Sequence, residues 1–385
     1  MLKPELVQPF LDLFPWPDDA KPGSQPYEIL QCYELSAPPD DVWHLMSDTS
    51  RLNRQLKIPS AIFSEANGAR FGVAEYFGIK NHWREPPWEW VQENMLVCTK
   101  EYSQGPMRSF RASFYLEPIE NGSRVWVYYG FSARGILGRL IMKRITGFIE
   151  KSYRRVMPRI QAHVQKGRVE DSPLVRRPRH VSPERMSKAE SLKSKLLSYC
   201  DEPEIADALI EHILYGDPLD LYRLRMKSLS RKWGFPYYEV LEMALHATRA
   251  GILTLSWDVI CPHCRGTRQE LAQLSAIPHE SSCEACDLVF GTEGEERIEV
   301  TFHVHPALRE IKKRVYCAAD AGSKPHIWFQ QHIRPQDERV LQIPLHPGTY
   351  CGRQRSVEKL LSLRVEEGGP DAVISLPEQL GESIV

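Results

Sequence analysis

Two pairs of cysteines constrain the fold more than any other feature of this sequence. In "CPHCRGTRQELAQLSAIPHESSCEACDLVF", Cys261 and Cys264 form one Cys-x-x-Cys pair, and Cys283 and Cys286 form the other, eighteen residues later. This spacing is typical of a zinc ribbon, in which each pair lies in a tight turn and the four thiolates surround one ion. A complete thiolate shell leaves no position for a water molecule, so we expect structural Zn²⁺ rather than a catalytic metal.

Other ligand sets remain open at this stage. His263 and His279 lie close enough in the sequence to compete as ligands, although solvent-facing loop histidines are the simpler interpretation. A [4Fe-4S] cluster also uses four cysteines, but the symmetric paired spacing favours zinc. The remaining cysteines are odd in number and scattered, which suits a reducing compartment better than a disulfide framework. They are Cys32, Cys98, Cys200, Cys317 and Cys351.

Length and charge limit the class of protein. A chain of 385 residues is long enough for several domains, because single cores rarely grow past about 250 residues. Its 49 Lys and Arg nearly balance its 50 Asp and Glu, so no global field favours phosphate backbones or anionic membranes. The N-terminus lacks a secretory signal, and no uncharged apolar run approaches the roughly 18 residues that span a bilayer. We therefore expect a cytoplasmic protein without a transmembrane segment.

Residues 26–165 carry the pattern of one α+β domain, after an N-terminal tail at 1–25. A period-two run begins at Tyr27 and is followed by Pro and Asp at a helix start. Hairpin signals follow at Asn67–Gly68 and in "ENGS" at 120–123, which predicts an antiparallel meander. "GILGRLIMKRITGFIEKSYRRVMPRIQAHV" then has apolar residues at helical spacing, and its basic opposite face is interpreted as solvated.

This order of elements resembles the START-like, or SRPBCC, helix-grip superfamily. "YELSAPPDDVWHLMSDTSRLNR" is similar to the opening of that family, "PPWEWVQENMLV" to its central strand and "YRRVMPRI" to its final helix. The resemblance implies a cavity for an apolar small molecule between sheet and helix. The aromatic density of the segment is compatible with a pocket wall, and equally with a filled core. The candidate ligand-binding residues are Trp43, Trp90, Tyr115, Tyr128, Phe131, Ile141, Ile145, Phe148 and Ile149.

The middle of the chain is expected to be a basic linker followed by helices. Residues 166–195 are rich in Lys, Arg and Pro and poor in apolar residues, which indicates a flexible linker; a partner-binding arm is the alternative. Residues 196–257 predict a small helical segment whose order is winged-helix-like. Because its second helix would present Glu239 and Glu242 to phosphates, we favour a structural bundle over a nucleic-acid-binding one.

The cysteines then place a zinc ribbon at 258–292, and alternating strands predict a small all-β module at 293–365, before a C-terminal tail at 366–385. The His303 and His305 side chains share one side of the first strand, where exposed residues are a simpler interpretation than a second metal site.

Residues 215–355 resemble a regulatory domain found before the catalytic domain of some bacterial class III adenylate or guanylate cyclases. The resemblance rests on "LYRLRMKSLSRKWGFPYYEVLEMALHATRAGILTLSWDVICPHCRG", "HESSCEACDLVF" and "ERIEVTFHVHPALREI". In that family a START-like domain commonly comes first. A cyclase catalytic domain with its two metal-binding aspartates is not recognisable in this sequence, so we expect this chain to be non-catalytic.

The leading hypothesis is a sensory or regulatory region that binds a small apolar ligand or a protein partner and acts on a cyclase catalytic domain. One alternative is a nucleic-acid-binding winged-helix and zinc-ribbon protein, and salt-dependent DNA or RNA binding would favour it. Another is an enzyme or lipid carrier that uses the START-like cavity, and turnover or transfer of an apolar substrate would favour that.

Overall fold

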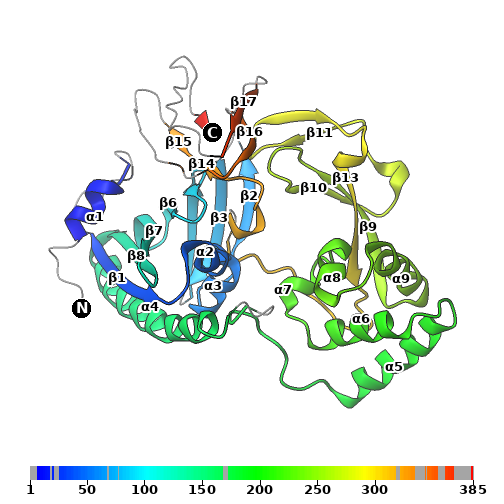
Figure 1. Cartoon of the computed structure of the whole chain (residues 1–385). Coiled ribbons are helices and arrows are strands. Elements are labelled where there is room, and N and C mark those ends of the chain that lie inside the picture. Colours follow the sequence, from blue (N-terminus) through cyan, green and yellow to red (C-terminus); the bar gives the residue numbers. More distant parts are fainter. Residues whose placement is uncertain are drawn as a thin grey trace. The chain divides into compact units, whose positions relative to one another are not determined.

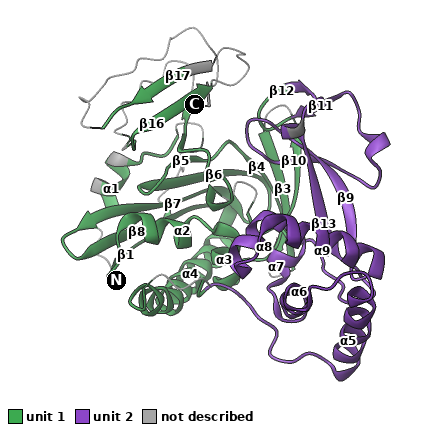
Figure 2. Ribbon diagram, turned by 45° about the vertical axis from the view of Figure 1, so that its right-hand side comes forward, with its two compact units in different colours: residues 1–173, 284–288, 315–385 green, residues 174–283, 289–314 purple. Residues whose placement is uncertain are grey.

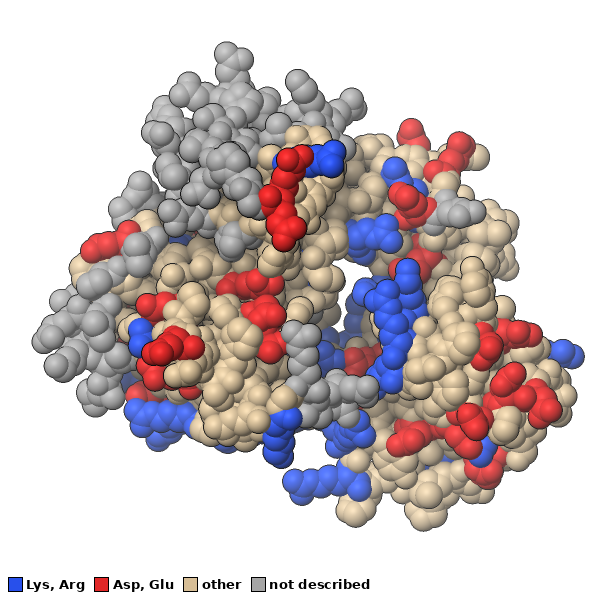
Figure 3. Space-filling view, in the orientation of Figure 1, with Lys and Arg blue, Asp and Glu red and all other residues tan. Residues whose placement is uncertain are grey.

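The computed structural model describes residues 7–17, 20, 26–66, 69–76, 78–167, 172–317, 321–333, 343, 345–353, 360–367 and 383–384. The chain divides into two compact units (Figure 2). Unit 1 contains residues 1–173, 284–288 and 315–385, and unit 2 contains residues 174–283 and 289–314. Figure 3 shows both basic and acidic side chains on the visible face of each unit, in keeping with the near-zero net charge.

A large antiparallel sheet forms the body of unit 1 (Figure 1). Its strand order is β1-β8-β7-β6-β4-β3-β2, and β5 pairs with both β6 and β14. The predicted meander is confirmed, including the turn between Ile119 and Gly122. The strands are β1 (Tyr27–Leu35), β2 (Ile62–Ala66), β3 (Ala69–Tyr76), β4 (Ile79–Glu85), β5 (Glu89–Val91), β6 (Met95–Gln104), β7 (Met107–Ile119), β8 (Gly122–Ala133) and β14 (Phe329–Gln330). The Asn67–Gly68 pair lies outside the described residues, but the strands on either side of it are paired.

The helices of unit 1 follow from local sequence. Helix α2 (Pro39–Met46) begins with a proline and two acids, as the first turn of a helix favours. Asp48 caps α3 (Thr49–Gln55) by accepting a hydrogen bond from the Arg51 backbone N–H at 3.0 Å. The long helix α4 (Gly135–Val164) follows β8, and a short α1 (Val7–Leu13) precedes the sheet. Strand, two short helices, meander and long helix form a helix-grip-like arrangement, as predicted.

The first turns of α4 differ from the expected pattern. Ile136, Leu137 and Leu140 are 79%, 66% and 64% exposed, although the spacing placed them on the apolar face. Gly138 is buried instead, and a Cβ there would lie 2.5 Å from the carbonyl oxygen of Pro106. The helix therefore approaches the sheet through a glycine at this end, which turns the neighbouring apolar side chains away from the core.

Unit 2 combines five helices of the described chain with a three-stranded sheet ordered β10-β9-β13. Its core contains Ile205, Leu209, Val240, Met243 and Phe302 among other buried side chains. The order α8, turn, α9, β9 agrees with the predicted helical segment, while the winged-helix label stays a prediction. The elements are α5 (Pro183–Leu197), α6 (Pro203–Tyr215), α7 (Pro218–Leu221), α8 (Met226–Trp233), α9 (Tyr237–Ala250), β9 (Leu253–Ile260), β10 (Thr267–Leu271), β11 (Glu280–Cys283), β12 (Leu288–Gly291) and β13 (Ile298–Val304).

The expected flexible linker at 166–195 is wrong for its second half. Helix α5 begins at Pro183, after Ser182 accepts a hydrogen bond from the backbone N–H of Arg185. Ala189 and Leu196 are almost completely buried in the core of unit 2. Sparse apolar residues at helical spacing are sufficient here, because a neighbouring core covers one narrow stripe of the helix.

The expected all-β module at 293–365 is also wrong. Its first strand, β13, pairs with β9 in unit 2, whereas β14 pairs with β5 in unit 1. Two further ladders join β15 (His332–Ile333) to β18 (Ser383–Ile384) and β16 (Gly348–Arg353) to β17 (Leu360–Val365). An alternating pattern shows that a strand forms, but it does not show which edge the strand joins. Much of the two predicted tails, 1–25 and 366–385, lies outside the described residues.

Among the described residues, no helix combines the length and apolar composition that crossing a lipid bilayer requires.

Candidate ligand cavity and metal centre

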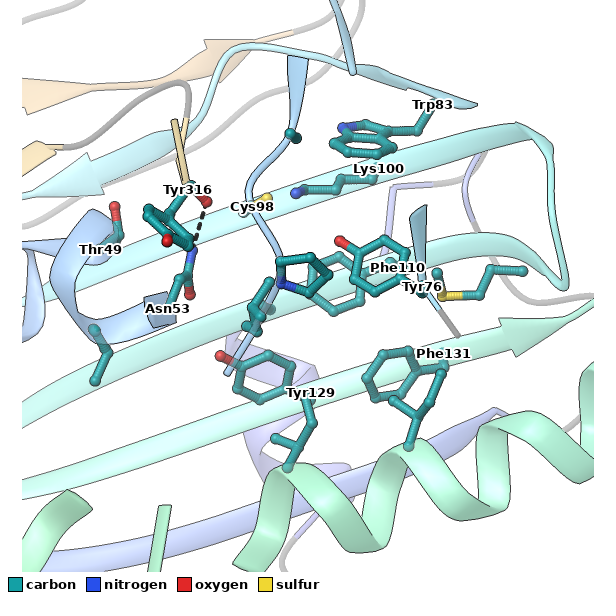
Figure 4. Close-up of a pocket in the computed structure, with 18 of the residues that line it drawn as sticks. Thr49, Asn53, Tyr76, Trp83, Cys98, Lys100, Phe110, Tyr129, Phe131 and Tyr316 are labelled. Atoms are coloured by element: carbon teal, nitrogen blue, oxygen red, sulfur yellow. Dashed lines mark hydrogen bonds between the residues drawn. The ribbon is translucent and has the colours of Figure 1, made fainter. Parts of the chain in front are cut away.

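A cavity of about 260 Å³ lies in unit 1 between the sheet and the helices (Figure 4). Its size is near the lower end of small-molecule sites. The cavity is lined by Thr49, Leu52, Asn53, Lys57, Ile58, Pro59, Ala61, Phe63, Glu75, Tyr76, Trp83, Trp88, Leu96, Cys98, Lys100, Tyr102, Met107, Phe110, Ala112, Ser113, Phe114, Tyr129, Phe131, Ile145, Phe148, Ile149, Tyr153 and Tyr316.

Strand periodicity explains much of this lining. Alternate side chains of a strand point to the same face, and Leu96, Cys98, Lys100 and Tyr102 are alternate residues of β6 that all line the cavity. Tyr129 and Phe131 do the same from β8, and α4 closes the opposite side with Ile145, Phe148, Ile149 and Tyr153. The hydroxyl oxygens of Tyr129 and Tyr153 lie 3.0 Å apart and connect sheet to helix.

Four of the sequence-predicted ligand residues line the cavity together: Phe131, Ile145, Phe148 and Ile149. Ile141 of the same helix is half-buried but does not line it. The three α4 residues of this set, Ile145, Phe148 and Ile149, lie within little more than one turn of the helix.

The expectation that four aromatic residues line the pocket is wrong. Trp43 packs against Phe114 from α2, and the fully buried Trp90 donates its indole N–H to the carbonyl oxygen of Ile327 at 3.1 Å. Tyr128 contacts the ring of Phe10 in α1, and Tyr115 contacts the ring of Phe14 just after this helix. Aromatic density identified a well-packed sheet, but it did not distinguish the two faces of that sheet.

A buried ion pair was missed by the sequence interpretation. The Lys100 ammonium nitrogen lies 3.5 Å from Oε2 of Glu85, whose side chain is fully buried. Glu85 also accepts hydrogen bonds from the indole N–H groups of Trp83 and Trp88. Burial lowers the pKa of Lys100, but the Glu85 charge raises it, and the net pKa lies well above the usual lysine value. The ammonium therefore remains charged at neutral pH.

Most of the other polar groups of the cavity are uncharged donors and acceptors, while the ionisable side chains of Lys57 and Glu75 also line it. Burial raises the pKa of Tyr76 and Tyr102, and it raises the pKa of Tyr129 to about 12. Burial also raises the pKa of the Cys98 thiol well above its usual value, which makes it a poor nucleophile. The site is thus chemically suited to binding through hydrogen bonds and apolar contact. A lysine at an inward position of the otherwise apolar β6 pattern was the sequence signal for this chemistry.

The four cysteines of the two Cys-x-x-Cys pairs come together in two turns next to paired strands. Cys261 and Cys264 lie between β9 and β10, whereas Cys283 is the last residue of β11 and Cys286 lies in the turn that leads to β12. In each turn the residue after the second cysteine has a left-handed backbone, with φ of 55° at Arg265 and 50° at Asp287. The backbone N–H of Cys261 donates to the Gly266 carbonyl at 2.9 Å and so closes the first turn.

The ligand atoms of the quartet fit a single ion. The four Sγ atoms all lie within 4.8 Å of one another, and Sγ of Cys264 is 3.8 Å from Sγ of Cys283. A tetrahedron with Zn–S bonds of about 2.3 Å requires sulfur–sulfur distances of about 3.8 Å. Among the described residues, neither His263 nor His279 belongs to this ligand group, and the His279 side chain is 95% exposed. The residues therefore suit one metal ion bound by four thiolates.

Comparisons with known proteins cover both units. A family described as "Family of unknown function (DUF5939)" matches residues 186–319. No curated protein matches the chain. Solved structures resemble about a third of it.

TTHA0849 from Thermus thermophilus is 22% identical, covers 37% of this chain and 99% of its own, and gives a TM-score of 0.28. The Zhui aromatase/cyclase from Streptomyces sp. R1128 is 11% identical, with coverages of 34% and 96% and a TM-score of 0.26. The di-domain ARO/CYC StfQ from the steffimycin biosynthetic pathway is 8% identical, with coverages of 37% and 51% and a TM-score of 0.28. Because these scores are low, our description of unit 1 rests on its own strand order and cavity.

Proposed function

We propose that unit 1 is a binding module for a small, largely apolar molecule, and that the chain is a non-catalytic sensory or regulatory region of a class III nucleotidyl cyclase. The observation that supports ligand binding is the cavity itself, whose walls combine aromatic rings with a few polar groups. The cyclase association is supported by the sequence resemblance of residues 215–355. In this proposal the chain alone produces no cyclic nucleotide from ATP or GTP with Mn²⁺.

The cavity is large enough for useful affinity. Burying apolar surface contributes roughly 25 cal/mol for each Å² removed from water, so a two-ring molecule can reach micromolar affinity. Phe110, Phe131 and Ile149 line the cavity and provide apolar surface of this kind, because none of these side chains carries a polar group.

The test is titration of the purified chain with 2-isopropylnaphthalene, in which binding is measured by the quenching of tryptophan fluorescence. We expect saturable binding of one molecule per chain. Ile145→Trp should weaken it at least tenfold, because the new ring occupies the cavity, whereas Ile136→Trp on the exposed side of the same helix should bind normally. Equal binding by both variants, or none by the wild type, would contradict the proposal.

We also propose that the cysteine quartet binds one structural Zn²⁺ in a zinc ribbon. The thiolate set and its geometry support this metal. When bound, the ion supplies folding energy to the two turns that carry the four cysteines.

Elemental analysis of the wild type should give one zinc per chain. Cys264→Ser should remove most of the zinc, and Cys351→Ser, at an exposed cysteine outside the quartet, should retain all of it. Iron with sulfide in place of zinc would identify a cluster, and no metal in freshly purified protein would reject the assignment.

A further inference from the structure

The polar end of the cavity allows a narrower statement about the ligand, which rests on the proposed binding function. The side chain of Lys100 is 17% exposed, whereas that of its partner Glu85 is 0% exposed. Lys100 lines the cavity, and Figure 4 shows its side chain among the aromatic residues that surround this space. The accessible part of the lysine is therefore available to a bound molecule.

The hydrogen-bonding capacity of this lysine is only partly used. An ammonium group carries three N–H donors. The distance of 3.5 Å to Glu85 is longer than the 2.7–3.2 Å of a good hydrogen bond. Among the described residues, the ion pair with Glu85 is the polar contact found for this ammonium. Its nitrogen otherwise faces the ring of Trp83, 4.8 Å from the centroid, and the ring of Phe110, 5.7 Å from the centroid. A buried donor without an acceptor is costly, so an acceptor atom at this position would be bound strongly.

The local charges favour a neutral acceptor. Glu85 already balances Lys100, and Glu65 balances the neighbouring Arg70 at 3.0 Å. Among the described residues, the other cation that lines the cavity is Lys57, and it is exposed. A ligand carboxylate next to Lys100 would therefore add a negative charge that no second buried cation in the cavity wall balances, and the desolvation of that charge would oppose binding. A carbonyl oxygen accepts from the ammonium without this cost.

The shape of the cavity sets a second condition on the ligand. Trp83 and Phe110 face the ammonium, and Phe131 lies farther along the same cavity. Flat aromatic ligands pack well against such walls. We propose that the cavity selects small, uncharged aromatic ketones, with the ligand carbonyl oxygen accepting a hydrogen bond from Lys100 and the ring system lying against the aromatic walls.

Three probes of similar shape separate these conditions. They are 2-acetylnaphthalene, which has the carbonyl; 2-isopropylnaphthalene, which lacks it; and 2-naphthoate, which carries a charge. We expect the ketone to bind at least about tenfold more tightly than the hydrocarbon, as expected for a hydrogen bond to a charged group. The naphthoate should bind more weakly than the ketone.

A charge-neutral pair of substitutions assigns the preference to the lysine. In the double variant Lys100→Met, Glu85→Gln, no unpaired charge is left in the interior, and the ketone should lose its advantage over the hydrocarbon. Tyr153→Phe removes a different cavity hydroxyl and should keep the preference. Retained affinity for the hydrocarbon shows that the cavity of each variant is intact.

The outcomes distinguish failure of the ketone assignment from failure of the proposed ligand-binding function. Equal wild-type affinity for ketone and hydrocarbon, or tightest binding of the naphthoate, would overturn the ketone assignment and leave the binding function standing. Failure of all three probes to bind the wild type would reject both. If the double variant does not fold, the comparison of the three probes on the wild type decides alone.

Discussion

Glu85 shows how a charged residue is accommodated inside a mostly apolar domain. Its two carboxylate oxygens receive the indole N–H groups of Trp83 and Trp88, and the ammonium of Lys100 balances its charge. Breaking a buried pair by removing one partner costs about 3–5 kcal/mol, because the other charge stays buried. This cost is why the test of the cavity replaces both partners together.

His212 is a titratable residue of unit 2 with a distinct consequence for stability. Its Nε2 is buried and has no hydrogen-bond partner among the described residues, and its ring contacts that of Trp233 edge to face. Burial lowers the pKa of His212 to about 4, although the nearby Asp220 opposes this effect.

The pH dependence follows from this shift. The unfolded chain binds a proton at His212 below about pH 6.5, whereas the folded chain resists that proton until about pH 4. Above about pH 6.5 the neutral His212 contributes its full stabilisation of unit 2. As the pH falls from about 6.5 to about 4, we expect the free energy of unfolding of unit 2 to fall by up to about 3 kcal/mol.

Urea titrations at pH 7 and pH 4.5 measure this loss. The loss should be smaller in His212→Gln and unchanged in His180→Gln, at an exposed histidine of the same unit. A wild-type stability that is independent of pH in this window would contradict the assignment.

At the scale of elements, the cavity depends on close packing between β3 and β4. A Cβ at Gly72 would lie 2.2 Å from the ring of Trp83, so only glycine leaves room for that ring. The ring in turn donates to Glu85 and faces Lys100. One strand position thus supports the whole polar end of the cavity.

Gly72→Ala should therefore destabilise unit 1 by about 1–3 kcal/mol, because the tryptophan ring must move in a packed interior. It should also weaken 2-acetylnaphthalene binding. Gly147→Ala is the matched control: it lies in α4 with open space around the added methyl, and alanine favours the helix. Thermal unfolding and ligand titration measure both effects, and equal stability of the two variants would show that the Trp83 ring moves freely.

At the scale of the whole molecule, the two units have separate hydrophobic cores. The core of unit 2 contains its helices together with Phe302 and Val304 of β13, whereas Phe10, Leu30 and Tyr128 pack together in unit 1. Units with separate cores commonly unfold separately.

Removal of the proposed zinc should test this independence. A strong zinc chelator should reduce hydrogen-exchange protection around Cys261 and in β9 and β13, because structural zinc supplies folding energy. Binding of 2-isopropylnaphthalene by unit 1 should remain. A parallel loss of ligand binding on chelation would show that the two units are energetically coupled.

The amino-acid sequence determined the local features. Period-two alternation gave β1, proline and acids gave the start of α2, and helical spacing gave α4. The two Cys-x-x-Cys pairs gave the two turns that bring the cysteines together. Each of these features depends on residues a few positions apart. Ile145, Phe148 and Ile149 line the cavity together for the same reason, and their role in ligand binding stays a prediction.

Only the tertiary structure decided which face of the sheet encloses the cavity and which edge each late strand joins. Alternation shows that Tyr128 lies on the opposite face from Tyr129, but not which of them points inward. The pairing of β14 with β5, and the contact of Trp90 with Ile327 across 237 residues, depend on folding that brings distant segments together. The Lys100–Glu85 pair belongs to the same class, because two charges on different strands become partners only when burial removes the competing water.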